Sequence, residues 1–201
     1  LAWVNARTNC PGRNVLEPWN LVPFFLSPFV GAIAWHNLAS PHTGLLNAWA
    51  RDYLGVETYL FNVDNIWGVI WVTGIFFAPL VYLFVVGSLR RMDPSLEDSA
   101  RTTGAGLMRT TLTVTLPLVA PAILSGAIIV FVTSAGEFGV PFKLSAPYGW
   151  ETLTTQIFSK AVGDQANHYL GAAMSMSLGI ITVFLIWIQQ RYIAPRSFTT
   201  V

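Results

Sequence analysis

The sequence predicts an all-α membrane protein, a bundle of helices that crosses a lipid bilayer several times. Hydrophobic residues make up 53% of the 201 residues and charged residues only 10%, whereas soluble domains carry about 25% charged residues. The mean hydropathy is +0.54. Four stretches are apolar and long enough to cross about 30 Å of hydrocarbon, which takes roughly 20 residues of helix. We therefore expect one transmembrane domain over residues 1–201.

The predicted spans are separated by polar loops. They cover residues 19–37, 66–89, 117–138 and 169–189, and the opening residues 1–4 have the composition of the end of a further helix that begins upstream. Prolines lie inside three of the spans, namely Pro23, Pro28, Pro79 and Pro121. Because proline removes a backbone hydrogen bond, we expect kinks at these positions, as a gated transporter would need and as many static bundles also have.

Several function classes are excluded by composition. The net charge of +1 and the absence of a basic patch exclude nucleic acid as a partner. The single cysteine, Cys10, has no partner for an internal disulfide. The chain has no Gly-x-x-x-x-Gly-Lys-Ser/Thr phosphate loop, and the spans offer no nucleophile, base or metal-ligand set. We expect no catalytic residue, cofactor or metal site, and therefore no enzyme; His36, His42 and His168 lack metal-ligand spacing.

The basic residues predict which side of the membrane each loop occupies. Eight of the eleven fall on one predicted side: Arg7, Arg13, Arg90, Arg91, Arg101, Arg109, Arg191 and Arg196. Only Arg51, Lys143 and Lys160 fall on the other. The side with eight should be cytoplasmic. This places the 93–117 loop inside the cell and the loops 38–65 and 139–168 outside.

The 93–117 loop has the pattern of a compact helix–turn–helix. Asp93 can cap free amides and Pro94 suits the first helical position, so a helix should begin here and run to Thr103. The glycines of Gly104-Ala-Gly106 would permit a sharp bend. A second short helix should then extend from Leu107 to about Leu116 and meet Pro117 at the membrane surface. Apolar side chains at 100, 107, 108 and 112 would be available for packing.

Glu137 is an ionisable group near membrane depth. It ends the third span in Gly136-Glu-Phe-Gly-Val-Pro141. Such groups usually face the protein interior or a water-filled cavity. We therefore treat Glu137 as a possible pathway or gate residue; the alternative is a carboxylate at headgroup level in contact with water.

Two segments of the loop match a known pattern at fixed spacing. Asp98-Ser-Ala-Arg-Thr-Thr-Gly104 is followed by nine residues and then by Val114-Thr-Leu-Pro117. This resembles the coupling loop of ABC-importer permeases, whose pattern is Glu-Ala-Ala, three residues, Gly, nine residues, Ile-x-Leu-Pro. Asp98, Ser99 and Val114 stand in place of the family's Glu, Ala and Ile. An ordinary amphipathic connector, the alternative for this loop, would not need fixed spacing.

The resemblance extends over most of the chain. Phe24-Phe-Leu-Ser-Pro-Phe-Val-Gly-Ala-Ile-Ala-Trp35, Gly44-Leu-Leu-Asn47 and Met92-Asp-Pro-Ser-Leu96 are similar to the ferric-iron branch of type I ABC importers. Branches for thiamine and polyamines are related. The stretch at 189–198 is similar to the segment that leads from the first core of a fused permease towards the second. The resemblance implies the family's five-helix permease core, with its first helix truncated here.

This resemblance also implies a function and partners. It implies a multi-pass permease subunit in a bacterial-type inner (plasma) membrane, driven by cytoplasmic ATPase subunits, fed by an extracytoplasmic solute-binding protein and completed by a second permease core. Ferric iron is the expected cargo. The implied coupling residues are Asp98, Ser99, Ala100, Arg101, Gly104, Gly106, Arg109, Val114, Leu116 and Pro117. An ion-coupled secondary transporter remains the alternative, but it leaves the spacing of the loop unexplained.

Overall fold

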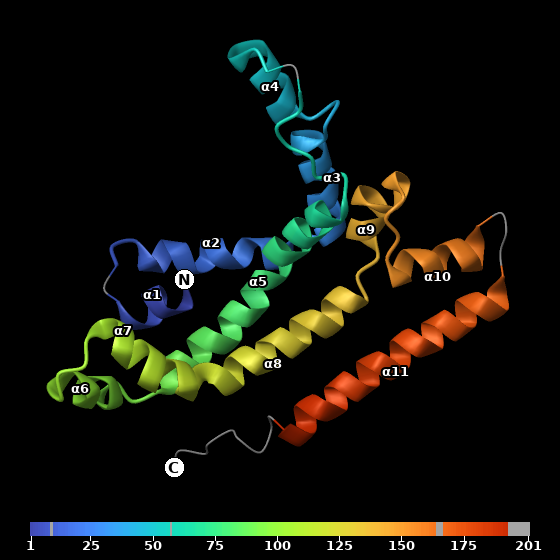
Figure 1. Ribbon diagram of the computed structural model, residues 1–201. Helices are drawn as coiled ribbons and strands as arrows, with labels where there is room; N and C mark the ends of the chain where they lie inside the picture. Colours follow the sequence, from blue (N-terminus) through green and yellow to red (C-terminus); the bar gives the residue numbers. More distant parts are fainter. Residues whose placement is uncertain (9, 57, 164–166, 193–201) are drawn as a thin grey trace. The chain divides into compact units, whose positions relative to one another are not determined.

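The computed structural model of the chain describes residues 1–8, 10–56, 58–163 and 167–192 (Figure 1). This described part consists of helices, turns and loops, without a strand. The helices are α1 (Ala2–Arg7), α2 (Arg13–Phe25), α3 (Pro28–Ala39), α4 (Leu45–Leu54), α5 (Ile66–Arg91), α6 (Ser95–Thr102), α7 (Leu107–Thr110), α8 (Leu116–Ala135), α9 (Gly139–Leu144), α10 (Leu153–Val162) and α11 (His168–Tyr192). A π-helical turn, η1 (Thr111–Thr115), joins α7 to α8, and a 3₁₀ turn, η2 (Ala146–Tyr148), follows α9.

Two compact units make up the fold. Unit 1 contains residues 1–22, 78–132 and 183–192, and unit 2 contains residues 23–77 and 133–182 with the gaps given above. The basic residues divide between them as the predicted sides of the membrane do. Unit 1 holds the described residues assigned to the cytoplasm, Arg7, Arg13, Arg90, Arg91, Arg101, Arg109 and Arg191, and unit 2 holds Arg51, Lys143 and Lys160. Arg196 and the 193–198 part of the linker-like stretch lie outside the described residues.

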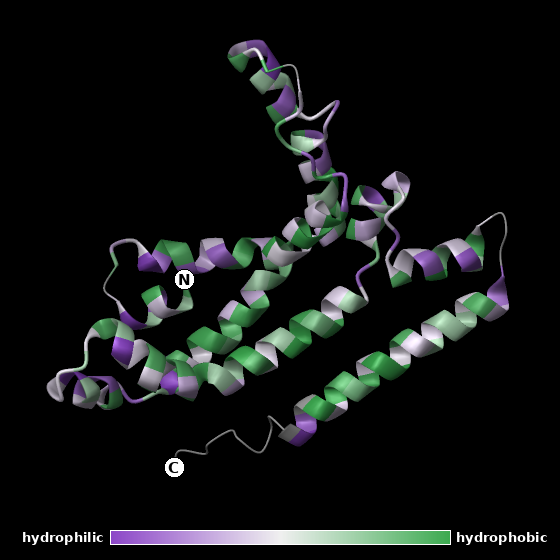
Figure 2. Cartoon of the chain, in the orientation of Figure 1, coloured by the Kyte–Doolittle hydropathy of each residue, from purple (hydrophilic) through white to green (hydrophobic). Residues whose placement is uncertain are grey.

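Three helical stretches are long and apolar enough to cross a membrane. They are Ile66–Arg91, Leu107–Ala135 and His168–Ile188, and hydrophobic residues dominate α5, α8 and α11 in Figure 2. They correspond to the predicted spans 66–89, 117–138 and 169–189. The helices continue through Pro79 and Pro121, which therefore interrupt neither α5 nor α8.

The first predicted span, 19–37, is not one continuous helix. It is divided between α2 and α3, which are bent by 98° at the break and which together pass as one broken span or a re-entrant loop. The break follows from Pro28, the first residue of α3: the residue before a proline is pushed out of the helical region, and Ser27 is extended. Pro23, in contrast, lies within α2 and does not end it.

The third span begins earlier and ends earlier than its predicted bounds of 117–138. Helical structure runs without a break from Leu107 through Pro117 to Ala135, so the short helix expected from Leu107 to about Leu116 is continuous with the third span. Proline inside a helix crowds the carbonyl four residues back, here that of Thr113. The wider π turn η1 lies at this position, and local π adjustments of this kind accommodate prolines in membrane helices.

Four apolar side chains are buried in unit 1, namely Tyr82, Val86 and Leu89 of α5 and Val119 of α8. Gly126 allows the two helices to approach closely, because a Cβ added to it would lie 3.2 Å from the Cα of Val81. Membrane helices commonly pack through small residues in this way.

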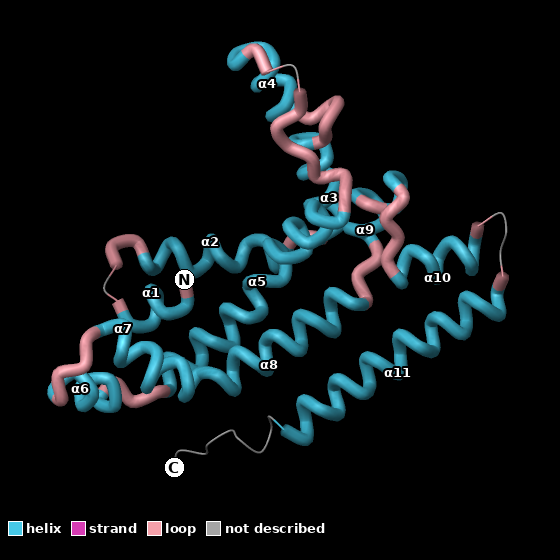
Figure 3. The backbone as a smooth tube through the Cα atoms, viewed as in Figure 1, coloured by secondary structure: helices cyan, strands magenta, loops and turns pink. Residues whose placement is uncertain are grey.

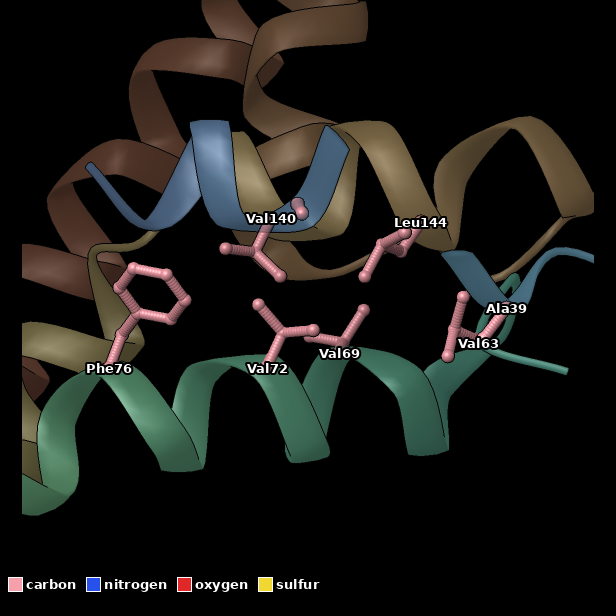
Figure 4. Packing of buried hydrophobic residues seen from close by; sticks show 8 residues of the cluster. Ala39, Val63, Val69, Val72, Phe76, Val140 and Leu144 are labelled. Carbon is pink, nitrogen blue, oxygen red and sulfur yellow. The ribbon is translucent and has the colours of Figure 1, made fainter. Parts of the chain in front are cut away.

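The core of unit 2 joins α3, α5 and α9. Figure 4 shows Val140 and Leu144 of α9 pointing toward Val69, Val72 and Phe76 of α5. A glycine, Gly31, lets α3 lie against the ring of Phe76, since a Cβ at that position would overlap the ring. Close packing of this kind fixes the position of α3 relative to the middle of α5.

Two buried polar side chains hold the 40–65 loop in unit 2. The amide of Asn47, 2% exposed, donates to the carbonyls of Ser40 and Phe61 and accepts from the amides of Leu60 and Phe61. Both N–H donors and both lone pairs of the Asn47 side-chain amide are thus paired with backbone groups. The backbone on either side of α4, at Ser40 and at 60–61, is therefore tied to α4 by hydrogen bonds that would be costly to lose.

Asp64 forms the second anchor of this loop. Its carboxylate accepts from Ser40 Oγ at 2.7 Å and lies 2.7 Å from His36 Nδ1. Tyr148 also hydrogen-bonds to it. Partial burial, followed by the bond to Asp64 and its negative charge, raises the pKa of Tyr148. The cluster links α3, the 40–65 loop and η2 on the predicted outer side.

Replacing Gly31 by Ala should destabilise unit 2. The added methyl group overlaps the Phe76 ring, and overpacking of a core costs about 1–3 kcal/mol. We expect a lower midpoint of thermal unfolding for the purified full-length protein in detergent. Gly74→Ala on α5, where a Cβ meets open space, is the matched control.

A second substitution tests the cause. Gly31→Ala combined with Phe76→Leu should recover part of the lost stability, because the smaller side chain vacates the overlapped space. Equal losses from Gly31→Ala alone and from the double variant would contradict the packing assigned to this pair.

Candidate coupling site

The loop begins with a side-chain cap. Asp93 Oδ1 accepts a hydrogen bond from the amide of Ser95 at 2.9 Å, which satisfies one of the free amides at the start of α6. These bonds to the Ser95 backbone and side chain lower the pKa of Asp93, because they favour the charged carboxylate. Glu97 and Asp98 follow in the first turn, where the helix dipole favours negative charge.

The end of α6 is a Schellman turn built on Gly104. Gly104 has φ = +88°, its amide bonds to the carbonyl of Arg101, and the amide of Ala105 bonds to the carbonyl of Ala100. This pair of bonds is the signature of the motif, which reverses the chain after a helix. The loop between α6 and α7 in Figure 3 follows from it. Gly104 is therefore a glycine for a conformational reason.

The backbone conformation of Gly106 does not require a glycine, and nothing in the structure explains why one is present. Its φ of −68° and ψ of 163° are extended values that any residue adopts. A Cβ on either Gly104 or Gly106 would meet no atom of this chain within 4 Å. The bend expected at Gly104-Ala-Gly106 thus depends on its first glycine only.

The predicted coupling residues lie mostly on the surface of unit 1. Asp98, Ser99, Arg101, Gly104, Gly106, Arg109, Leu116 and Pro117 are exposed, and Ala100 and Val114 are half-buried. Large apolar side chains are exposed beside them, namely Leu96, Leu107, Met108 and Leu112, with Met108 74% exposed. Charged and apolar side chains together are typical of a protein-binding surface. This mixed surface of α6, α7 and η1 is called the loop face below.

The inner side of the loop contains a residue that sequence analysis missed. Glu97 is only 6% exposed; its Oε1 accepts a hydrogen bond from Thr115 Oγ1 at 2.7 Å and lies 3.6 Å from Arg7 Nε. Arg7 in turn donates from Nη2 to the carbonyl of Met92 at 2.9 Å. The sequence offered no specific signal, since Glu97 and Asp98 are adjacent acidic residues and only their helical phase separates them.

Glu137 has a structural role in unit 2. Its Oε1 accepts hydrogen bonds from the amides of Gly139 at 3.0 Å and Val140 at 3.3 Å, at the start of α9. Its backbone carbonyl accepts from Thr154 Oγ1 at 2.9 Å. The half-buried carboxylate thus caps α9 and connects the end of α8 to the start of α10.

The 2–198 stretch of the chain matches the family of binding-protein-dependent transport system inner membrane components. The chain belongs to this family. Membership confirms the resemblance to ABC-importer permeases, and with it the expectation of a multi-pass protein of the inner membrane.

Curated members of the family are similar over most of the chain. The ferric transport system permease protein FbpB of Actinobacillus pleuropneumoniae is 25% identical over 91% of this chain. The molybdenum transport system permease protein ModB of Escherichia coli K12 is 28% identical over 92% of this chain. The chain spans 26% of the length of this FbpB and 80% of the length of this ModB.

A solved structure confirms the fold class. The crystal structure of a bacterial alginate ABC transporter in complex with its alginate pentasaccharide-bound periplasmic protein matches with a TM-score of 0.74 at 18% identity, covering 94% of this chain and 68% of the matched chain. At this identity the likeness concerns the fold alone. The permease has the all-α bundle that the sequence predicts.

Gly104→Ala should weaken the loop, whereas Gly106→Ala should leave its stability nearly unchanged. A left-handed conformation costs an L-residue about 1–2 kcal/mol, which corresponds to at least about fivefold faster amide hydrogen exchange. Exchange at residues 99–105 of the full-length permease measures this. Equal effects of the two substitutions would contradict the Schellman turn.

Two substitutions at Glu137 separate capping from a role of its charge. Glu137→Gln keeps an oxygen that can accept from Gly139 and Val140, and Glu137→Ala removes it, at a cost of about 1 kcal/mol. If capping is the whole role, transport by the Gln variant should equal that of wild type and only the Ala variant should lose stability and transport.

A gate role for Glu137 gives the opposite result. Transport would then fall in the Gln variant as well, although its thermal stability is retained. Uptake into proteoliposomes and thermal unfolding, measured on both variants, distinguish the two outcomes.

Proposed function

We propose that this chain is the permease core of an ATP-driven, binding-protein-dependent importer, and that the 93–117 loop couples it to a cytoplasmic ATPase. The chain itself carries no ATP-binding phosphate loop, so ATP hydrolysis is assigned to separate subunits. The proposal rests on family membership for the class of transporter and on the geometry of the loop for the coupling step.

The loop face is the observation that carries the proposal. It presents Leu107, Met108 and Leu112 beside Asp98, Arg101 and Arg109 in the part of the chain that the basic residues assign to the cytoplasm. Apolar side chains can enter a groove of a partner, and the charges can pair with opposite charges around it. The Schellman turn and the buried hydrogen bond between Glu97 and Thr115 restrict bending of the loop. Movement of the partner would therefore pass into the spans.

The other partners are assigned to other surfaces. A substrate-loaded binding protein would dock on the loops 38–65 and 139–168, which contain α4, α9 and α10. A single core cannot enclose a pathway, so a second core, fused or separate, would complete it. In this cycle ATP binding draws the ATPase subunits together and opens the pathway outward, and hydrolysis resets it inward. Glu137 would lie at the outer mouth of the pathway.

The cargo of the importer is proposed to be an inorganic ion. Relatives named for ferric iron and for molybdenum support this class. Ferric iron is the first candidate, because the quoted segments resemble the ferric branch, and molybdate is the second. Thiamine and polyamine permeases are more distant alternatives on the same resemblance.

An ion-coupled secondary transporter is the competing function. It would use the membrane helices and Glu137 but would have no use for an exposed loop face at fixed spacing from Leu116 and Pro117. It also predicts uptake driven by an ion gradient in the absence of ATP. The membrane-enzyme alternative lacks a nucleophile, base or metal set in the spans.

Gly104→Asp should abolish stimulation of ATP hydrolysis by the loaded binding protein while the complex remains assembled. The substitution places a charged side chain where the Schellman turn requires φ = +88° and where the partner is proposed to sit. The measurement uses the full-length permease in proteoliposomes with its ATPase and with binding protein loaded with ferric iron or with molybdate; the ligand that stimulates identifies the cargo.

Gly12→Asp is the matched control for this experiment. Gly12 also has φ = +88° and open space around its Cβ position, but it lies between α1 and α2 and is not part of α6, α7 or η1, which form the loop face. Stimulation should survive Gly12→Asp. Stimulation that also survives Gly104→Asp would refute the coupling role of the loop, and uptake without ATP would favour the secondary transporter.

A further inference from the structure

We propose that Glu97 is a positioning residue. Its buried carboxylate holds the coupling loop against α1, the end of α5 and the start of α8. This inference rests on the proposed function of the loop and adds the means by which the loop is held. None of the polar residues implied by the family resemblance supplies that means, since the side chains of Asp98, Ser99, Arg101 and Arg109 are exposed.

The carboxylate of Glu97 joins both ends of the loop. Glu97 belongs to α6, at the beginning of the loop, whereas Thr115, which donates to it at 2.7 Å, is the last residue of η1 and directly precedes α8. A hydrogen bond to an ionised acceptor is stronger than one between neutral groups. The loop is thus closed at its base by one buried bond.

Arg7 extends this joint to two further helices. Its Nε lies 3.6 Å from Glu97 Oε1, and its Nη2 donates to the carbonyl of Met92, just after α5. Asn5, also on α1, donates from Nδ2 to the hydroxyl of Tyr82 within α5 at 2.8 Å. The side chains of Arg7 and Glu97 are 10% and 8% exposed, so solvent screens this ion pair little.

Burial makes the joint obligatory. A buried carboxylate without partners is strongly unfavourable. Glu97 must therefore keep its contacts with Thr115 and Arg7 for as long as its carboxylate is buried. Displacement of α6 by a partner would therefore draw α1, the end of α5 and the start of α8 with it. The exposed Asp98 faces outward from the same helical turn, so that one acidic residue is available for contact and its neighbour for anchoring.

The first test uses Glu97→Gln, with Glu17→Gln as the control. Gln keeps an acceptor for Thr115 but removes the charge that faces Arg7. Glu17 forms a more exposed ion pair with Arg90, with side chains 31% and 52% exposed, outside the loop. Amide exchange in α6 of the assembled complex should rise about five- to tenfold in Glu97→Gln and stay at the wild-type value in Glu17→Gln.

The second readout is the amount of substrate transported per ATP hydrolysed in proteoliposomes. We expect this ratio to fall in Glu97→Gln while basal ATP hydrolysis and subunit composition are retained. Thr115→Val, which removes the hydroxyl and preserves the side-chain shape, should act in the same direction and provides the test if the Glu97 variant fails to assemble.

The outcomes separate this inference from the proposed function. Unchanged exchange in α6 of both variants would refute the lock, and raised exchange with an unchanged transport ratio would show that the joint is structural only. A wild-type complex whose ATP hydrolysis does not respond to the loaded binding protein would instead refute the proposed function, whatever the Glu97 variants do.

Discussion

Hydrocarbon offers no hydrogen-bond partner to the backbone, so the spanning helices α5, α8 and α11 must stay unbroken across the bilayer and the helices can be interrupted only where other partners are present. Each interruption must supply polar partners for the amides that it exposes. Side chains do so at five helix starts: Asn65 bonds to the amide of Gly68 in α5, Asp93 caps α6, Glu137 caps α9, Thr152 forms a capping box with Thr155 at α10, and Asn167 bonds to the amide of Leu170 in α11. These five side chains therefore bond to amides at or near the starts of helices, where no preceding helical turn supplies a carbonyl.

The same constraint gives each unit a small number of buried polar anchors. In unit 2, Asn47 of α4 holds the backbone on either side of α4, and Asp64 links this segment to His36 of α3. In unit 1, Glu97 holds the start of the 93–117 loop to Thr115 at its end. In each case one side chain holds segments that are distant in the sequence. A hydrophobic contact would tolerate sliding, whereas a buried hydrogen bond is lost when its partners move apart. These anchors hold together segments whose large apolar side chains are mostly exposed and contribute little to a core.

Most of the fold and part of the site could be predicted from the sequence. Long apolar runs, basic residues and the Asp93-Pro94 signal depend on local composition, and α5, α11 and the start of α6 follow from them. The break at Ser27 could not be placed, because Pro23 and Pro28 are equivalent as signals and only the backbone at Ser27 decides between them. The π turn before Pro117 was also missed, since it depends on how the helix accommodates a proline.

The role of Glu97 was missed for a related reason, and it explains how one short helix serves two purposes. Successive residues of an α-helix are separated by about 100° around its axis, so adjacent carboxylates at 97 and 98 cannot share an environment. One is buried against Thr115 and Arg7, and the other is exposed on the loop face. In the proposed function, the pattern that starts at Asp98 marks the residue that a partner would contact. A force that a partner applies there can reach the membrane helices through the Glu97 contact with Thr115 and Arg7, and also along the chain, which continues from α7 through η1 into α8.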